Sequence, residues 1–188
     1  MLKPESIFAF PNKPIRFYDV QGFISSLKEE DWISQPKWDG HRAEIVCDEA
    51  GKITVFSRNK TRLALAKNNW GWLNMLDIPR PWLLDAELLR DGRMITWDYA
   101  MINGQYGTIR PYLERLTKLE KMVPKKLTHG DHSIEVIETL PLNGYRKFLL
   151  KAGDPALEGF VLKNKMATDL WGPNSTKEVA SQFKYRFK

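Results

Sequence analysis

A lysine that follows an apolar stretch is the first residue of this sequence whose surroundings suit covalent chemistry. It begins the segment Lys37-Trp-Asp-Gly-His-Arg42, in which Asp39 and Gly40 form a turn. A lysine becomes a nucleophile when burial or nearby cations lower its pKa. Other cations of the chain could have this effect, namely Arg42, Lys163 and Lys184. A turn with a solvated lysine is the alternative, and it is the more common explanation of so short a motif taken alone.

Two acids stand at alternate positions of an apolar strand, in Leu84-Asp-Ala-Glu-Leu88. The alternation of a strand directs Asp85 and Glu87 to the same face. Two carboxylates on one face are costly to bury unless cations, hydroxyls or a metal ion accompany them. A ribose hydroxyl or Mg²⁺ would serve, and an exposed sheet face is the alternative.

Two further segments carry a cluster of cations at the end of a strand or an aromatic ring on a strand. Arg58, in Phe56-Ser-Arg-Asn59, is followed by Lys60 and Arg62, and such a cluster either binds phosphates or is a solvated loop. Trp97 stands on a strand beside the acidic one and could stack on a nucleobase. A tryptophan in a strand is more often a core residue.

Two more candidate segments lie near the end of the chain. In Glu158-Gly-Phe-Val-Leu-Lys163, strand parity places Glu158, Phe160 and Leu162 on one face and Val161 and Lys163 on the other. Gly159 permits another backbone to approach closely. In the last segment the cations share one face, which is solvated in most proteins, and these are Lys184, Arg186 and Lys188.

In this order the motifs K-x-D-G-x-R, S-R-N, D-A-E-L, W-D, E-G-x-V-x-K and K-x-R resemble those of the covalent nucleotidyltransferase superfamily. That superfamily contains ATP-dependent DNA ligases, RNA ligases and mRNA capping guanylyltransferases. The resemblance runs from about Gln35 to Arg186. It is nearest to the DNA ligases, because capping enzymes typically carry Asp where Glu158 stands, and many RNA ligases carry Asn at Arg42.

The resemblance implies that Lys37 attacks the α-phosphorus of ATP and forms a lysyl-AMP phosphoramidate. AMP would then pass to a nucleic-acid 5′-phosphate, and a 3′-hydroxyl would displace it and seal the strand. Such in-line displacements rely on positioning and on neutralised charge. The implied nucleotide-binding residues are Gln35, Arg42, Arg58, Glu87, Trp97, Val161, Lys163, Lys184 and Arg186, while Glu87 and Glu158 are the implied ligands of Mg²⁺ or Mn²⁺.

Within this set the resemblance implies separate tasks. The two lysines Lys163 and Lys184 would contact the α-phosphate, and Glu87 would contact the ribose. Trp97 would stack on adenine, with Val161 or Phe160 against the opposite face of the base.

Two substitutions depart from the family pattern. Gln35 stands where many DNA ligases have Glu, at a position that helps to read the adenine amino group, and it can still accept a hydrogen bond. Arg186 replaces a lysine, which keeps the charge and changes the geometry.

The composition is that of a basic globular protein. The chain has 188 residues, 43% of them hydrophobic, and a formal net charge of +6. This charge suits a polyanionic partner such as nucleic acid, and a basic but otherwise ordinary soluble enzyme explains it equally well. No apolar run is long enough for a membrane span, and no signal peptide is recognisable. The single cysteine, Cys47, excludes an intrachain disulfide and a cysteine-rich zinc site. We expect an intracellular protein, in the cytoplasm or nucleoid, or in the host cytoplasm if it is viral.

The predicted strands and helices that carry these residues indicate an α+β fold, with helices packed on antiparallel β-sheets. Antiparallel sheets are expected because the predicted hairpins outnumber the candidate crossover connections between parallel strands. With the resemblance, this becomes a ligase-type, ATP-grasp-like nucleotidyltransferase domain over residues 1–188, without an OB-fold domain and with an N-terminal segment, 1–34, of unclear role. The expected helices are 19–32, 67–76, 111–122 and 142–151, and the expected strands are 33–38, 42–47, 52–57, 82–89, 93–100, 133–138, 159–164 and 178–187.

The resulting hypothesis is a monomeric ATP-dependent DNA ligase, or its adenylation domain, that acts on nicked duplex DNA in replication, repair or recombination. An RNA ligase or a capping-type nucleotidyltransferase is the alternative within the superfamily. A non-catalytic module that binds nucleic-acid ends is the alternative outside it, and the lysine nucleophile argues against that module, since a binder needs none.

Overall fold

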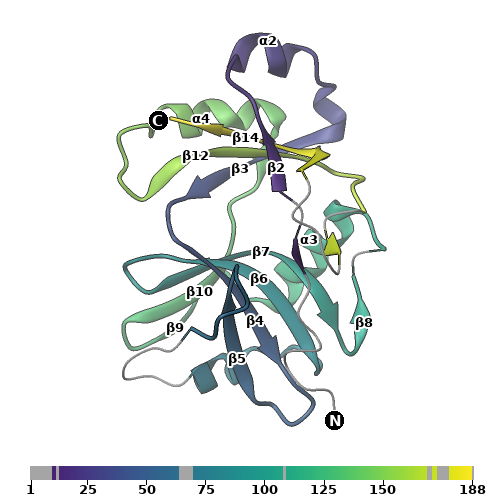
Figure 1. Ribbon diagram of the computed structural model, residues 1–188, viewed down its shortest axis with the longest axis vertical. Coiled ribbons are helices and arrows are strands. Elements are labelled where there is room, and N and C mark those ends of the chain that lie inside the picture. Colours follow the sequence, from purple (N-terminus) through teal and green to yellow (C-terminus); the bar gives the residue numbers. More distant parts are fainter. Residues whose placement is uncertain are drawn as a thin grey trace.

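The computed structural model describes residues 10–11, 13–63, 70–107, 109–168, 171–172 and 178–187. Most of its strands form two sheets, which occupy the upper and lower halves of Figure 1. The upper sheet has the order β11 (Leu140–Pro141), β3 (Trp32–Trp38), β12 (Leu157–Asn164), β14 (Glu178–Arg186) and β2 (Lys13–Arg16). A separate short pair joins β1 (Phe10–Pro11) to β13 (Trp171–Gly172).

The lower sheet has the order β5 (Ile53–Ser57), β4 (His41–Cys47), β6 (Trp82–Leu88), β7 (Arg93–Ile102), β10 (His132–Val136) and β9 (Leu127–His129), with β8 (Gln105–Tyr106) paired to β7. The hairpins β4–β5 and β6–β7 are antiparallel, as predicted. Two strand pairs are parallel instead, β10 with β7 and β14 with β2.

Within the described residues the chain crosses between the two sheets twice. The first crossing is Asp39 and Gly40, between β3 and β4, and the second is residues 137–139, between β10 and β11. The lower sheet is therefore inserted into the upper one. Both crossings bring the chain past the region between the sheets, where Gly40 and Ile137 line a cavity.

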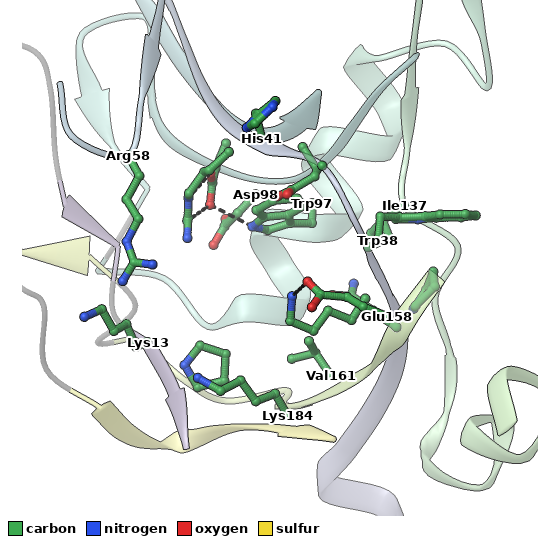
Figure 2. Close-up of a pocket in the computed structure, with 18 of the residues that line it drawn as sticks. Lys13, Trp38, His41, Arg58, Trp97, Asp98, Ile137, Glu158, Val161 and Lys184 are labelled. Atoms are coloured by element: carbon green, nitrogen blue, oxygen red, sulfur yellow. Dashed lines mark hydrogen bonds and ion pairs between the residues drawn. The ribbon is translucent and has the colours of Figure 1, made fainter. Parts of the chain in front are cut away.

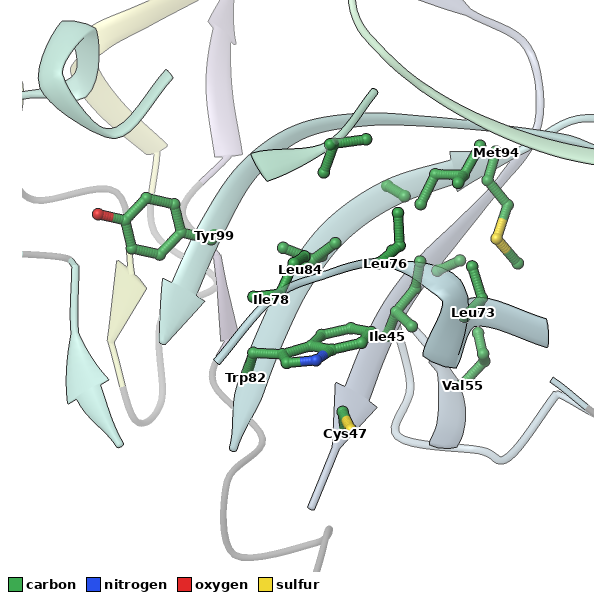
Figure 3. Close-up of a cluster of buried hydrophobic side chains, with 14 of the residues drawn as sticks. Ile45, Cys47, Val55, Leu73, Leu76, Ile78, Trp82, Leu84, Met94 and Tyr99 are labelled. Carbon is green, nitrogen blue, oxygen red and sulfur yellow. The ribbon is translucent and has the colours of Figure 1, made fainter. Parts of the chain in front are cut away.

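The larger core lies under the lower sheet, against the 3₁₀ helix η2 (Trp70–Met75) and the helix α3 (Tyr112–Met122). Figure 3 shows Ile45 and Cys47 of β4 beside Trp82 and Leu84 of β6 in this cluster. These residues alternate along their strands, as a sheet with one face on this core requires. The intervening Val46 and Leu83 are also buried, in a separate cluster.

The upper sheet has an aromatic core of its own, covered by α2 (Val20–Ser25), η3 (Leu142–Gly144) and α4 (Tyr145–Leu149). Phe160 of β12 lies at its centre, with ring centroids 5.9 Å from Phe17 and 5.4 Å from Tyr185. Alternate residues of β14, including Phe183 and Tyr185, pack into this core. The opposite face of β14 is thereby left to its cations.

The helix predicted over residues 19–32 is wrong in its extent. Asp19 is the N-cap, as predicted, and its Oδ1 accepts a hydrogen bond of 3.0 Å from the Gly22 amide. The helix ends at Ser25, because Ser25 and Ser26 turn their hydroxyls to backbone carbonyls three residues earlier. A short 3₁₀ turn, η1 (Glu29–Asp31), follows, and Trp32 already belongs to β3.

The helix predicted over residues 67–76 is a 3₁₀ helix, η2, within its described part; residues 67–69 lie outside the described residues. Trp70, Leu73 and Leu76 are buried, as predicted. A spacing of three suits a 3₁₀ helix, which has three residues per turn. The hydrophobic pattern was therefore right about the face and wrong about the helix type.

The helix predicted over residues 111–122 is present as α3, but its buried face differs from the prediction. Leu116 and Leu119 are buried, whereas Leu113 is 41% exposed. Tyr112 and Arg115 occupy the buried face in its place. Arg115 pairs with Asp98 of β7, with an Nε–Oδ1 distance of 2.9 Å, and this ion pair accompanies the rotated helix face. The prediction for residues 142–151 is matched by η3 and α4.

None of the helices in the described part of the chain is long and apolar enough to cross a lipid bilayer.

Candidate functional site

A cavity of about 1030 Å³ opens between the two sheets. Its wall combines strands β2, β3, β12 and β14 with strands β4, β6 and β7. Seven cationic and four acidic side chains line it, so the wall carries a positive balance suited to an anionic ligand. All eleven predicted site residues lie on this wall, namely Gln35, Lys37, Arg42, Arg58, Glu87, Trp97, Glu158, Val161, Lys163, Lys184 and Arg186. Their separate roles stay predictions.

Lys37 projects from β3 into the cavity and forms an ion pair with Glu158 of β12. The second oxygen of Glu158, Oε2, lies 3.3 Å from Nε of Arg186 on β14. One carboxylate therefore joins cations from both neighbouring strands of the upper sheet. Figure 2 shows Glu158 at the cavity wall, with a dashed line that marks its ion pair with Lys37.

The orientation of Glu158 corrects the face predicted for it from strand parity. Phe160 and Leu162 are buried in the aromatic core, whereas Glu158 lines the cavity together with Val161 and Lys163. The register of β12 against β3 shifts between Leu157 and Gly159, and such a bulge reverses the alternation before it. A Cβ at Gly159 would lie 1.9 Å from the backbone oxygen of Tyr185, so the predicted close backbone approach is confirmed.

Phe160 is excluded from the cavity by its position. It is fully buried, and Val161 is the residue of this pair that lines the wall. Of the two residues predicted to pack against the face of adenine opposite Trp97, only Val161 lines the cavity.

Arg42 is held by Asp85, a residue to which the family resemblance assigned no role. Nε of Arg42 donates to Oδ1 of Asp85 at 2.8 Å, and Nη2 donates to Oδ2. The indole nitrogen of Trp97 also donates to Oδ2, at 2.7 Å. The two-pronged geometry is typical of arginine with a carboxylate. Asp85 thus positions both a cation and an aromatic ring of the cavity wall.

Trp97 lines the cavity and also packs against the small hydrophobic cluster of Leu89, Ile95 and Ile137, so the two alternatives for this residue are combined. The Arg42 guanidinium carbon lies 5.4 Å from the indole centroid, and the Lys163 ammonium lies 5.8 Å from it. The ring is therefore flanked by cations, an arrangement favoured by the charge distribution of an aromatic ring.

Glu87 stands two residues after Asp85 on the same face of β6, as predicted, and both line the cavity. Burial raises the pKa of Glu87 to about 7, although Lys37 and Arg42 act against this shift. Gly40 of the first crossing packs over this strand. A Cβ at Gly40 would lie 2.6 Å from the Leu88 backbone oxygen and 2.8 Å from Cγ of Glu87, so only glycine fits there.

Lys163 lies on the buried wall of the cavity, beside Tyr112 of α3. Its ammonium lies 3.2 Å from the Tyr112 hydroxyl and 4.3 Å from the centre of that ring. Burial lowers the pKa of Lys163 to about 8, and the negative charges of Asp98 and Asp85 limit the shift. At neutral pH the cavity therefore keeps a cation at its base.

The side-chain amide of Gln35 is buried on the same wall, 1% exposed. Its nitrogen Nε2 donates to the Tyr112 hydroxyl at 2.9 Å and to Oγ1 of Thr139 at 2.8 Å. Thr139 belongs to the second crossing between the sheets. Neither Tyr112 nor Thr139 stood out in the sequence, because each reaches Gln35 only through the tertiary fold.

Three cations lie on one side of the cavity in Figure 2, Lys13 from β2, Arg58 after β5, and Lys184 from β14. Arg58 is exposed, and Lys13 is half-buried. Burial lowers the pKa of Lys184, and the positive charges of Arg186, Lys37 and Arg58 add to this effect. Lys13 lines the cavity, so the segment 1–34, whose role was unclear, contributes at least this residue to the cavity wall. Lys188 lies outside the described residues.

The acids of the cavity are too few for a metal centre made of protein ligands alone. Among the described residues, no group of three or more His, Cys, Asp and Glu could hold a metal ion. Mg²⁺ often takes only one or two carboxylates and completes its shell with water and phosphate oxygens. The negative charge of Glu158 contributes to the raised pKa of Glu87. These two acids suit a cation that arrives with a phosphorylated ligand.

Solved structures of several nucleic-acid ligases share the fold of this chain. A mycobacterial DNA ligase D in complex with ATP matches with a TM-score of 0.66 at 20% identity, over 95% of this chain and 60% of that one. The ATP-dependent DNA ligase of bacteriophage T7, also with ATP, matches with a TM-score of 0.64 at 14% identity, over 94% and 68%. This chain has the fold of a ligase nucleotidyltransferase domain.

An archaeal ATP-dependent RNA ligase shares the fold less closely, with a TM-score of 0.55 at 12% identity, over 93% of this chain and 47% of that one. No protein-family model and no curated protein sequence matches the chain. The nucleotidyltransferase fold confirms the predicted α+β class and the resemblance to the adenylation domains of ATP-dependent DNA ligases. The chain spans about 60% of the length of the mycobacterial ligase chain.

Proposed function

We propose that the protein is an ATP-dependent ligase that forms a covalent adenylate at Lys37, passes AMP to a 5′-phosphate and seals nicks in duplex DNA. The observation that carries this proposal is the convergence of all eleven candidate residues on one cavity between the sheets. They come from segments as far apart in the sequence as Gln35 and Arg186, and the fold brings them together. Two DNA ligases with this fold are complexes with ATP, which supports ATP as the substrate.

The first step joins Lys37 to the nucleotide. Nζ of Lys37 forms a bond to the α-phosphorus while the bond from that phosphorus to the pyrophosphate oxygen breaks, and the amine proton passes to solvent or to Glu158, its ion-pair partner. The negative charge that spreads over the phosphoryl oxygens meets Lys163 and Lys184 on the same wall. The protein therefore contributes a nucleophile and a fixed positive environment.

Glu87 and Glu158 are the residues that would hold Mg²⁺ or Mn²⁺ together with the phosphates of the nucleotide. The metal would supply further positive charge at the phosphoryl oxygens. Glu158 then has two tasks, since it also orients Lys37 and Arg186.

The nucleic acid would approach from the side of the cavity where Lys13, Arg58 and Lys184 gather. Contacts of lysine and arginine with phosphates carry most non-specific affinity for DNA and weaken with salt. Nicks of this kind arise in replication, repair and recombination. We place the enzyme inside the cell as a monomer, where its one free cysteine, the buried Cys47, suits a reducing compartment.

Two assays test the proposal. Incubation with ATP that carries a labelled α-phosphate, in the presence of Mg²⁺, should label the protein. Labelling by GTP in place of ATP would favour a capping-type enzyme. Nicked duplex DNA should then be sealed faster than nicked RNA, and equal or faster sealing of RNA would move the protein to the RNA ligases.

A further inference from the structure

Three cations of the cavity wall form no ion pair with another described residue, namely Lys13 of β2, Arg58 after β5 and Lys184 of β14. We propose that Lys13 and Arg58 form a subsite for the β- and γ-phosphates of ATP and for the pyrophosphate that leaves when AMP is transferred. This inference rests on the proposed function, because it concerns the leaving group of the same reaction. It gives a task to Lys13, to which the family resemblance assigned none.

Other cations of the wall already have acidic partners. Glu158 contacts Lys37 and Arg186, and Asp85 holds Arg42. The positive charge that a ligand can still neutralise is therefore concentrated on the side of the cavity where the other cations gather. A polyanion gains most from a surface of this kind.

The cations on this side come from both sheets. Lys13 and Lys184 lie on the paired strands β2 and β14 of the upper sheet, and Arg58 follows β5 of the lower one. Burial lowers the pKa of Lys184, and the charge of Arg58 adds to this effect, while Glu178 opposes it. The cations of the two sheets thus lie near enough to repel one another, and a bound anion would relieve this repulsion.

The turn after β5 holds Arg58 in place. The Ser57 amide donates to the Thr61 carbonyl at 2.8 Å, and the Lys60 amide donates to the Ser57 carbonyl at 2.9 Å. Oγ of Ser57 accepts hydrogen bonds of 3.3 Å from the amides of Asn59 and Thr61. Because the backbone on both sides of Arg58 is bonded in this way, an anion can bind without first ordering the turn.

The direction of the transfer places the leaving group on the same side. In an in-line displacement the attacking and departing atoms lie on opposite sides of the phosphorus. Figure 2 shows Glu158, the partner of Lys37, across the cavity from Lys13 and Arg58. Attack by Lys37 on an α-phosphate between them directs the pyrophosphate toward Lys13 and Arg58. The negative charge that the departing oxygen gains as its bond breaks then meets two cations.

Binding of nucleotides with and without the terminal phosphates tests the subsite apart from catalysis. The intact protein is titrated by calorimetry, with Mg²⁺ present, with AMP and with the α,β-methylene analogue of ATP, whose carbon bridge prevents transfer to Lys37. The wild-type protein should bind the analogue at least about 10-fold more tightly than AMP, because charged groups contact the added phosphates. Lys13→Met should reduce this ratio at least about fivefold and leave the affinity for AMP within about twofold.

Two control variants separate the role of Lys13 from a general effect of charge. Lys28 belongs to the same segment, 1–34, and is exposed outside the cavity, so Lys28→Met should keep the wild-type ratio. Lys13→Arg keeps the positive charge at the cavity and should retain at least about half of the ratio, because both side chains bind phosphate.

The phosphates of a nucleic acid offer the same chemistry, and reversal of the adenylation step distinguishes them from pyrophosphate. In this reversal a pyrophosphate oxygen bonds to the α-phosphorus, the bond from phosphorus to Nζ of Lys37 breaks, the amine takes up a proton, and ATP leaves. The pyrophosphate concentration that gives half the maximal rate should rise at least about 10-fold in Lys13→Met. Sealing of saturating nicked DNA by protein that is already adenylated involves no pyrophosphate and should change by less than about threefold.

An unchanged ratio of affinities in Lys13→Met would overturn the inference, and so would an equal loss in Lys28→Met. A loss in sealing as large as the loss in reversal would assign Lys13 to the nucleic acid and overturn it as well. If ATP labels the wild-type protein while Lys13→Met keeps the wild-type ratio, the proposed function stands and the inference alone fails. A ratio that depends on Lys13, in a protein that ATP does not label, would leave the phosphate subsite and remove the proposed function.

Discussion

Lys37 and Glu158 form an ion pair between neighbouring strands of the upper sheet, and Glu158 also contacts Arg186 on the next strand. The proposed nucleophile is therefore restrained before any ligand binds. The long, flexible side chain of a lysine loses rotamer freedom when its ammonium group is held in such a contact. The pair holds the amine on the wall where Lys163 and Lys184 also lie.

Glu158→Gln should slow self-adenylation by at least about 10-fold, because it removes a charge that orients Lys37 and that we assign to the metal. The free energy of unfolding should change by less than about 1 kcal/mol, since a partly exposed pair contributes little to stability. Initial labelling rates and urea unfolding measure the two effects. Glu114→Gln, which breaks the exposed pair with Arg110, is the matched control. Similar labelling rates for the two variants would contradict the role of Glu158.

The pair of Arg42 with Asp85 is expected to matter for stability as well as for the site. Asp85 is buried, so Arg42→Ala leaves a carboxylate without its cation and should cost roughly 2–4 kcal/mol. Replacement of both residues, by Arg42→Met and Asp85→Leu, should restore much of this loss, because the buried carboxylate is then removed together with its cation. Urea unfolding of the single and double variants gives the coupling energy. Additive losses would show that the two side chains are not coupled.

The sequence predicted the eight longest of the described strands, the hairpins and a set of residues that the fold brings to one cavity, because these depend on local alternation and on motif order. It did not predict the short strands β1, β2, β8, β9, β11 and β13. Asp85 and Glu87 were placed on one face correctly, since parity holds along an unbroken strand. Parity failed for Glu158, where a bulge precedes Gly159. A bulge depends on the pairing with a neighbouring strand, in this case β3, and parity along a single strand carries no information about that pairing.

Other features escaped prediction because they are contacts between distant segments. Arg115 resembled a surface residue of an amphipathic helix until the structure placed it against Asp98. That contact turned Tyr112 inward, beside Gln35 and Lys163. Lys13 stands in a segment without a recognisable motif and reaches the cavity only because β2 pairs with β14. No periodicity in the sequence carries such information.

Glu87 is expected to make stability depend on pH. The pKa of Glu87 is about 7 in the folded protein, whereas the ordinary value of 4.5 applies to the unfolded chain. Between pH 4.5 and pH 7 the folded state therefore holds a proton that the unfolded state has released. Stability therefore falls as pH rises through this window. Glu87→Gln removes the effect, and its stability relative to wild type should rise by roughly 1–3 kcal/mol between pH 5 and pH 8. Urea unfolding at the two pH values checks this, and a constant difference would contradict the burial of a charged Glu87.

Lys163 is expected to make nucleotide binding depend on pH in the alkaline range. Burial lowers its pKa to about 8 in the free protein, so a rise in pH through this value removes a positive charge from the cavity. The affinity for the α,β-methylene analogue of ATP should fall as pH rises, with a midpoint above 8, because a bound phosphate favours the charged amine. Lys163→Arg stays charged and should flatten the profile. Calorimetric titration from neutral to alkaline pH provides the measurement, and a wild-type profile as flat as that of Lys163→Arg would exclude Lys163 as a phosphate contact.

The identity of the labelled residue tests the central claim most directly. After incubation with ATP and Mg²⁺, intact mass spectrometry should find the mass of one added AMP, and peptide mapping should locate it on Lys37 through an acid-labile bond. Lys37→Arg keeps the charge, cannot be adenylated in this way, and should carry no adduct while it retains the fold. An adduct on another residue, or an adduct that persists in Lys37→Arg, would contradict the proposal that this protein is a lysine nucleotidyltransferase acting through Lys37.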